Sequence, residues 1–456
     1  MAKVWLLSIF TVGFVAAETD GLTDFSNNLA SDIGPLLVLF GESMTKQYLS
    51  ESTSFLDYFI FAMAPIGIIT AVVSTIRLCG HSSLRAFIGR SQEGDGVIEA
   101  ELCTSTSRDV CELFTRGGIT RVLGRPSILE LIYDPRRRND DTAGLFLFRH
   151  YLETEVLQKS RASKESGVSH RSSDWEEVPE WRWPWTRHNQ KNKPSRLFAP
   201  HPNLSLNVGI VKRPKWVFFT VALVGFILQA GVLVLAGTGV WILGWNLNQG
   251  APASRLYAPI MYIVGTVLMC GGMWGCAALI GQSTDEIYFR RNPRSKTPTT
   301  HLLWIQPGPQ VIGDQSFDPF AYIEKTDDPL RVWTSSMKSA ESQFEAHTFV
   351  AVLAVLIGYI MQFIGLRGMK AWVSLAQLAT TIMMSILRGA LRMQRMSRKG
   401  NRLADKPDIV AGYELDWLAF NVFWPGEENK VLFWHITEVI VFRQFSRAPS
   451  SLREHP

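Results

Sequence analysis

The sequence predicts an α-helical integral membrane protein: a bundle of about five transmembrane helices with a small mixed α/β cytosolic unit built from the loops between them. Three observations predict this class. Apolar residues, 46% of the 456, gather into long blocks, Lys and Arg fall almost entirely on one side of those blocks, and the loops contain short strand-like runs. A soluble core rarely grows beyond about 250–300 residues, so concentrated apolar blocks favour a membrane location.

Five apolar blocks are long enough for a crossing. A bilayer core is about 30 Å thick and needs about 20 apolar helical residues, with a lower limit near 17. We expect transmembrane helices at 58–76, 216–236, 257–280, 348–366 and 371–387. One continuous helix over the last two blocks would span about 60 Å at 1.5 Å per residue, twice the bilayer. A tight turn at Leu366–Lys370 is therefore expected to separate them.

Residues 1–17 have the layout of a secretory signal peptide. Lys3 precedes an apolar stretch, and Val15 and Ala17 occupy the positions of small residues before a cleavage site. An uncleaved anchor is the alternative. A cleaved signal would place residues 18–57 in the lumen or outside the cell. In that segment Ser54-x-x-Asp57 matches a capping box for the first crossing.

The distribution of positive charge predicts the orientation. If the N-terminus is lumenal, the cytosolic segments are 77–215, 281–347 and 388–456. These segments contain 41 of the 46 Lys and Arg residues, which is the excess that cytosolic loops carry near helix ends. We expect five crossings in a membrane of the secretory pathway, plasma membrane or endomembrane, with the C-terminus cytosolic. Arg367 and Lys370 then lie outside, where long side chains can snorkel to the headgroups.

The cytosolic loops predict the α/β unit. A helix is expected at 105–114, and Ile119–Leu123 with Ile128–Tyr133 favour a β-hairpin. Further strands are expected at 145–149, 204–211, 301–305, 310–312 and 320–323. Residues 156–202, rich in Lys, Arg, Ser and Pro, are interpreted as a flexible insert.

The insert contains the tryptophan-rich stretch WEEVPEWRWPW. Its four tryptophans are Trp175, Trp181, Trp183 and Trp185. One interpretation is a partner motif or an interfacial membrane contact, because Trp favours the headgroup region. The other is a loop folded against the cytosolic unit. The sequence leaves both open.

A basic stripe follows the last apolar block. Its members, at three- or four-residue steps, are Arg388, Arg392, Arg395, Lys399 and Arg402. On a continuing helix they would share one face and suit anionic lipids of the cytosolic leaflet, at about 1 kcal/mol per residue. The stripe is thus the candidate lipid contact. An ordinary topology anchor would need only the first two.

Motifs for enzyme chemistry are absent from the sequence. It contains no HExxH, CxxC, GxSxG, Walker A or GxGxxG pattern, and its histidines never fall at metal-binding helical spacing. No catalytic, cofactor-binding or metal-ligating residue is predicted, and no cofactor or nucleic acid partner is expected. Gln229 and Gln377 are the amides well inside the apolar blocks, and we expect them to hydrogen-bond between helices. Gly271-x-x-x-Gly275 is an expected helix-packing face.

Several blocks resemble a known group of proteins. They include FGESMTKQYLSESTSFLDYFIFAMAPIGIITAVVSTIR, SLRAFIGRSQEG, EAELCTSTSRDVCELF, FIGLRGMKAWVSLAQLATTIMMSILRGALR and GYELDWLAF. The sequence resembles an uncharacterised family of multi-pass membrane proteins from filamentous fungi, over Phe40 to about Phe420. The resemblance implies a membrane location and no assigned activity. Some similar proteins continue into ankyrin repeats, which this sequence does not show.

These observations predict a non-enzymatic scaffold or signalling protein that presents a cytosolic domain at the membrane. Its expected partners are the lipid bilayer and an unknown protein bound by the cytosolic loops. A channel or transporter is the alternative function, although ionisable residues are missing from the interior of the five blocks. A membrane-embedded enzyme is the third.

Overall fold

The chain divides into two units in the computed structural model. The helical unit comprises Met1–Thr104, Ile210–Asp285 and Lys338–Arg395, and the α/β unit comprises Ser105–Gly209, Glu286–Met337 and Met396–Pro456. The structure describes residues 39, 41–52, 54–104, 106–115, 118–137, 144–154, 174–178, 201–204, 213–244, 254–291, 300–324, 330, 332–338, 344–393, 408–409, 413–414 and 416–418.

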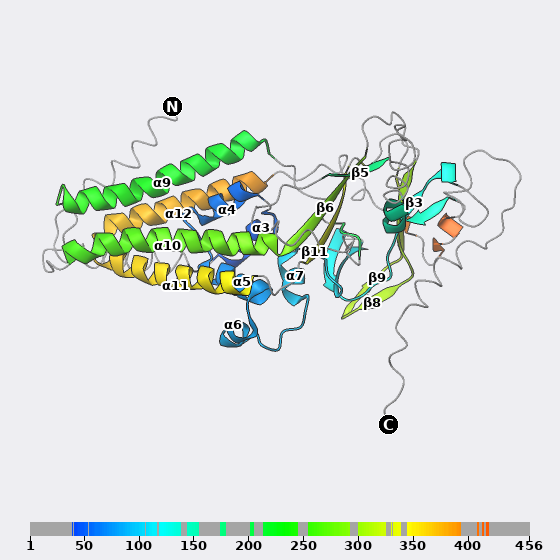
Figure 1. The fold of residues 1–456 in the computed structure, drawn as a ribbon, viewed down its shortest axis with the longest axis horizontal. Coiled ribbons are helices and arrows are strands. Elements are labelled where there is room, and N and C mark those ends of the chain that lie inside the picture. Colours follow the sequence, from blue (N-terminus) through cyan, green and yellow to red (C-terminus); the bar gives the residue numbers. More distant parts are fainter. Residues whose placement is uncertain are drawn as a thin grey trace, which may run out of the picture. The chain divides into compact units, whose positions relative to one another are not determined.

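Long apolar helices form the helical unit (Figure 1). In the described part of the chain, four are long and apolar enough to cross a membrane: α9 (Lys215–Trp241), α10 (Ser254–Gln282), α11 (Glu345–Arg367) and α12 (Ala371–Arg392). They confirm the helices expected in the last four apolar blocks. Gly368, Met369 and Lys370 lie between α11 and α12, so the expected break between the last two blocks is also confirmed.

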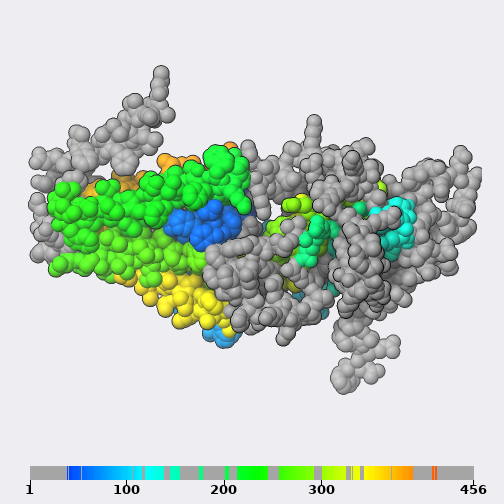
Figure 2. Space-filling view, turned by 45° about the horizontal axis from the view of Figure 1, so that its top comes forward, coloured from blue at the N-terminus to red at the C-terminus, as the bar shows by residue number. Residues whose placement is uncertain are grey.

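The outer surface of these helices is apolar. Large side chains such as Trp216 (69% exposed), Val350 (65%) and Ile386 (61%) point away from the bundle. Figure 2 shows α9 and α10, in two greens, running side by side along the face in view. Extended apolar surface of this kind is unfavourable in water and is compatible with lipid tails around an integral membrane protein.

Helices α10 and α11 pack backbone to backbone through glycines. A Cβ atom at Gly265 would lie 2.4 Å from the Gln362 nitrogen, and one at Gly272 would lie 2.7 Å from the Val355 nitrogen. Small residues allow such close approach in membrane helices. The predicted packing face Gly271-x-x-x-Gly275 is therefore confirmed at Gly275 and wrong at Gly271. Gly275 meets Ala351, whereas a Cβ at Gly271 would meet nothing within 4 Å, and its neighbour Gly272 makes the contact instead.

The expected first crossing at 58–76 is not one helix. The structure has α4 (Phe55–Ala62) and α5 (Ile68–Cys79), separated by five residues. Pro65 has no N–H to continue the helix, and Gly67 begins α5 in the left-handed region at φ 72°. At 1.5 Å per residue the two helices span about 12 and 18 Å, so neither crosses a bilayer core alone.

Among the described residues, the helical unit also contains the short helices α3 (Glu42–Ser50), α6 (Ser82–Phe87) and α7 (Val97–Leu102). Together with α4 and α5 they gather at the end of the bundle where α10 finishes (Figure 1). The expected capping box is confirmed at the start of α4. The Asp57 N–H donates to the Ser54 hydroxyl and the Ser54 N–H donates to the Asp57 carboxylate, at 3.3 and 3.1 Å.

A five-stranded antiparallel sheet lies at the centre of the α/β unit. Its spatial order is β12 (Asp408–Ile409), β10 (Phe320–Ile323), β7 (His301–Gln306), β3 (Leu129–Tyr133) and β4 (Leu145–Leu147). The strands come from three chain segments that helices of the helical unit separate: β3 and β4 from the first, β7 and β10 from the second, and β12 from the third. The pairings of β3 with β7 and of β10 with β12 join these segments into one sheet. The mixed α/β unit built from inter-helix loops is thus present, and part of the C-terminal tail joins it.

Smaller sheets complete this unit. One has the order β11 (Val332–Lys338), β6 (Thr284–Arg291) and β5 (Trp175–Val178); two hairpins pair β1 (Val110–Thr115) with β2 (Gly118–Leu123) and β8 (Gln310–Ile312) with β9 (Gln315–Phe317). A single 3₁₀ turn, η1 (Pro135–Arg137), follows β3.

The strand predictions in the second loop are confirmed, and two predictions in the first loop are wrong. The expected helix at 105–114 contains strand β1, whose apolar run is buried on both faces, so its periodicity does not separate strand from helix. The expected hairpin has the right strands with the wrong partners, because β2 pairs with β1 while β3 pairs with β4 and β7. Most of the strand expected at 204–211 lies outside the described residues.

Candidate functional site

Arg388, the first member of the predicted lipid-binding stripe, is inside the protein. Helix α12 continues past the predicted end of the crossing, and Arg388 is 4% exposed within it. Its Nε donates to the Ile60 carbonyl at 3.2 Å, and its Nη2 donates to the carbonyls of Phe61, Met63 and Ala64 at 3.1, 2.5 and 2.9 Å. A lipid headgroup contact for Arg388 is thus corrected to a contact with backbone.

The carbonyls that Arg388 binds lie at the end of α4 and in the break after it. Those of Ile60 and Phe61 belong to α4, and those of Met63 and Ala64 belong to the segment between α4 and α5. The last four carbonyls of any helix lack intrahelical partners, and Pro65 cannot donate to them. Unpaired carbonyls in an apolar interior cost several kcal/mol in total. A guanidinium presents five N–H donors in one plane, so a single side chain can satisfy several of these oxygens. Arg388 therefore holds the break between α4 and α5.

Arg392, one turn further along α12, is also engaged. Its Nη2 lies 2.8 Å from the Asp57 carboxylate and its Nε lies 3.6 Å from Glu51, with 10% of the side chain exposed. The guanidinium also stacks over the Tyr48 ring at 4.8 Å. Arg392 thus ties the C-terminal end of α12 to the N-terminal end of α4. The other stripe members, Arg395, Lys399 and Arg402, lie outside the described residues.

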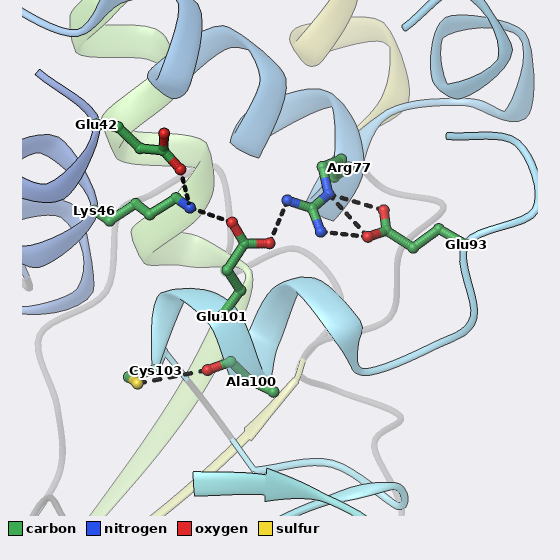
Figure 3. A network of polar contacts seen from close by, with 7 residues as sticks. All are labelled: Glu42, Lys46, Arg77, Glu93, Ala100, Glu101 and Cys103. Carbon is green, nitrogen blue, oxygen red and sulfur yellow. Dashed lines mark hydrogen bonds and ion pairs between the residues drawn. The ribbon is translucent and has the colours of Figure 1, made fainter. Parts of the chain in front are cut away.

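A second polar cluster joins α3, α5 and α7 (Figure 3). The Arg77 side chain, 5% exposed, contacts Glu93 through Nε at 2.8 Å and Glu101 through Nη1 at 2.5 Å. Lys46 links the other oxygen of Glu101 to Glu42. We call these five residues the ion-pair network. The acidic partners of Arg77 have no periodic spacing relative to it in the sequence, so no sequence signal reveals them.

The amides expected to join helices do so. The side chains of Gln229 on α9 and Gln377 on α12 exchange two hydrogen bonds, at 3.1 and 3.2 Å. Tyr262 on α10 donates its hydroxyl to the same Gln377 oxygen at 2.7 Å. This prediction is confirmed, and the three side chains form a buried polar contact shared by three helices.

Of the four tryptophans in the tryptophan-rich stretch, Trp175 is among the described residues. Trp175 opens strand β5 and is 2% exposed, packed edge-on against Phe148 at 5.8 Å between ring centroids. The Arg291 guanidinium covers its ring at 4.5 Å. Trp175 therefore belongs to the core of the α/β unit, which agrees with the folded-loop interpretation for this residue. Trp181, Trp183 and Trp185 lie outside the described residues.

The α/β unit also contains buried ionic groups. Asp134, 1% exposed, accepts two hydrogen bonds from Arg136, at 2.9 and 3.1 Å, and one from the Tyr151 hydroxyl at 3.2 Å. Glu324 pairs with Arg291 at 2.5 Å. Within the described residues, no group of three or more His, Cys, Asp and Glu side chains could hold a metal ion.

Glu130 is a carboxyl group placed against the sheet core. It lies opposite Trp304 on β7, and its carboxyl group hydrogen-bonds Trp333. Burial raises the pKa of Glu130 to about 8. The folded chain therefore keeps a proton at neutral pH that the unfolded chain releases near pH 4.5. Stability is lost as the pH rises from about 4.5 to about 8, because only the unfolded chain gains charge freely over that range.

We expect Glu130→Gln to flatten this pH dependence. The amide has the same shape and no titration, so the variant should gain stability over the wild type between pH 5 and pH 8, on the order of 1–2 kcal/mol, since the side chain keeps some exposure. Thermal unfolding of the full chain in detergent, followed by tryptophan fluorescence, measures this. Glu176→Gln, at an exposed carboxylate of the same unit, is the control. Parallel pH profiles for wild type and Glu130→Gln would contradict the assignment.

Comparison with known proteins adds no relative. No protein-family model matches the sequence, and neither a curated protein nor a solved structure is significantly similar to it. The resemblance to the fungal membrane proteins stays a prediction.

Proposed function

We propose that the protein is a non-enzymatic scaffold that holds its α/β unit at the cytosolic face of a secretory-pathway membrane and presents it to other proteins. The four spanning-length helices and their apolar outer surface support membrane embedding. The excess of Lys and Arg in the α/β segments supports a cytosolic location for that unit.

The observation that carries the proposal is that the strands of the central sheet come from different segments of the chain. Strands β3, β7 and β12 belong to three chain segments separated by helices of the bundle. Each of these three segments contributes buried side chains to the unit, among them Leu131, Leu303 and Leu418. The α/β unit is thus joined to the bundle helices through several connections of the chain. Such a domain suits a role in which its position at the membrane matters.

The polar contacts inside the bundle favour a scaffold role rather than a channel or transporter role. Described arginines and amides inside the bundle are held by other protein groups: Arg388 binds backbone carbonyls, Arg392 binds the Asp57 carboxylate, and Gln229 binds Gln377. Groups that serve a transport path must exchange partners with a solute. These contacts instead fix the helices to one another. In the α/β unit, Asp134 is likewise held by Arg136 and Tyr151, which favours a structural role over catalysis.

The test compares proximity labelling of neighbours in cells by the full chain and by two variants. Trp304→Ala removes the fully buried centre of the α/β core, and Val311→Ala truncates a 76% exposed side chain of the same unit. We expect a defined set of cytosolic proteins to be labelled by wild type and Val311→Ala and lost with Trp304→Ala, while all three remain in the membrane fraction. Labelling that Trp304→Ala leaves unchanged would overturn the scaffold role. Solute or ion flux through vesicles containing the purified chain would favour the channel.

A further inference from the structure

Both ends of the α4–α5 pair lie at the same end of the bundle. Tyr58, in α4, reaches Gly281, since a Cβ there would lie 2.0 Å from the Tyr58 hydroxyl oxygen. Cys79, the last residue of α5, donates its thiol to the Leu279 carbonyl at 3.8 Å. Gly281 and Leu279 both belong to the last turn of α10. The chain therefore enters and leaves this part of the bundle at one level.

The break between the two helices lies deeper. Cys270 of α10 hydrogen-bonds the backbone of Ala64, about ten residues before the level at which Tyr58 and Cys79 lie. At 1.5 Å per residue the break is about 15 Å further along α10, or half the thickness of a bilayer core. In Figure 2 the blue surface of the early residues likewise covers the green helices near one end only, on the face in view.

The ion-pair network joins charged residues on the two sides of this pair in the sequence. Lys46 precedes α4, whereas Glu101 follows α5, and their side chains form an ion pair (Figure 3). Arg77, in the last turn of α5, binds the same Glu101. Two side chains in contact cannot stand on opposite faces of a hydrocarbon layer about 30 Å thick.

From this geometry we propose that α4 and α5 form a re-entrant hairpin. The hairpin enters the bilayer to about half its depth and returns to the side from which it came, so that residues 41–54 and 80–104 face the same compartment. Within the described residues the chain then has four crossings in place of the five expected from the sequence. With the positive charge near the helix ends cytosolic, residues 41–54 are cytosolic as well. This location replaces the lumenal one that a cleaved signal peptide predicts for residues 18–57. The proposal requires membrane embedding and does not depend on the scaffold role.

Arg388 explains how such a hairpin is stable. Non-helical backbone at membrane depth is tolerated only where protein groups satisfy it. The break leaves carbonyls without helical partners, and the Arg388 guanidinium binds four of them from α12. The hairpin is therefore held at its turn by Arg388 and at its base by the ion-pair network.

Cysteine accessibility in the full chain tests the proposal. Cys103 is the exposed native thiol among the described cysteines and is replaced by serine, while the other four are buried. Single cysteines are then introduced as Ser43→Cys before the hairpin, Ser83→Cys after it, and Lys370→Cys in the turn between α11 and α12. All three positions are exposed. A membrane-impermeant maleimide is applied to intact cells and to permeabilised cells.

We expect the Ser43 and Ser83 variants to be labelled together, only after permeabilisation, and the Lys370 variant to be labelled in intact cells. Labelling of the Ser43 variant with the Lys370 variant would show a crossing between residues 43 and 83 and overturn the hairpin. A second measurement uses Lys46→Cys with Glu101→Cys and a short bis-maleimide in the membrane. Cross-linking within one chain supports the hairpin, and its absence when each cysteine is labelled singly contradicts it.

Discussion

Arg388→Ala should leave the helical unit unable to fold stably. The substitution removes every donor that the guanidinium gives to the carbonyls of residues 60, 61, 63 and 64, and each buried carbonyl left without a donor costs about 1–3 kcal/mol. Fluorescence-detected size exclusion in mild detergent measures the monodisperse fraction, and thermal unfolding of that fraction gives the midpoint. We expect a loss of most monodisperse protein.

Two further variants separate this role from lipid binding. Arg388→Lys keeps the charge but replaces a planar fork by one ammonium group, so it should recover only part of the stability. Arg90→Ala, at an exposed arginine near α6, should behave as wild type. If Arg388→Ala were stable and merely bound anionic vesicles less tightly, the surface stripe predicted from the sequence would be the better description of Arg388.

Leucine at Gly272 should separate α10 from α11, whereas leucine at the neighbouring Gly271 should not. A Cβ at Gly272 would lie 2.7 Å from the Val355 nitrogen and 2.9 Å from the Ala351 carbonyl oxygen, which are backbone atoms that cannot turn aside. Overpacking of this kind costs about 3 kcal/mol or more when the backbone must move. At Gly271 the same side chain has open space.

The two leucine variants have the same composition and hydrophobicity, so their difference reports packing alone. Their midpoints of thermal unfolding in detergent should differ by several degrees or more, with Gly272→Leu the lower. Equal midpoints would mean that α10 and α11 do not approach as closely as the structure has them. Gly265→Leu, where a Cβ would lie 2.4 Å from the Gln362 nitrogen, should resemble Gly272→Leu.

The sequence predicts the parts of this fold whose information is local. Apolar blocks of sufficient length became α9 to α12, and short apolar runs at 301–305, 310–312 and 320–323 became strands. The break at Pro65 and Gly67 was missed because the residues around it are apolar, and hydropathy records composition and not backbone continuity. A proline followed two residues later by glycine is the signal that could have found it.

Other features depend on tertiary contacts that no pattern contains. Helical spacing correctly places Arg388 and Arg392 one turn apart on α12, but it does not say whether that face meets lipid or the end of α4. The pairing of β3 with β7 joins segments far apart in the chain, so the closeness of 119–123 and 128–133 in the sequence favoured the wrong hairpin. Trp175 became a core residue because Phe148 and Arg291 enclose it, which a tryptophan-rich composition cannot show.

The order of the sheet has a consequence for biosynthesis. A ribosome completes β3 about 170 residues before β7, a delay on the order of 10–30 s at usual rates of chain elongation. During that interval α9 and α10 are made, and the inner edge of β3 has no partner to cover it. The nascent α/β segment must stay soluble while the bundle is being inserted. Chaperone dependence of the early chain, relieved once residue 306 has left the ribosome, is the expected outcome.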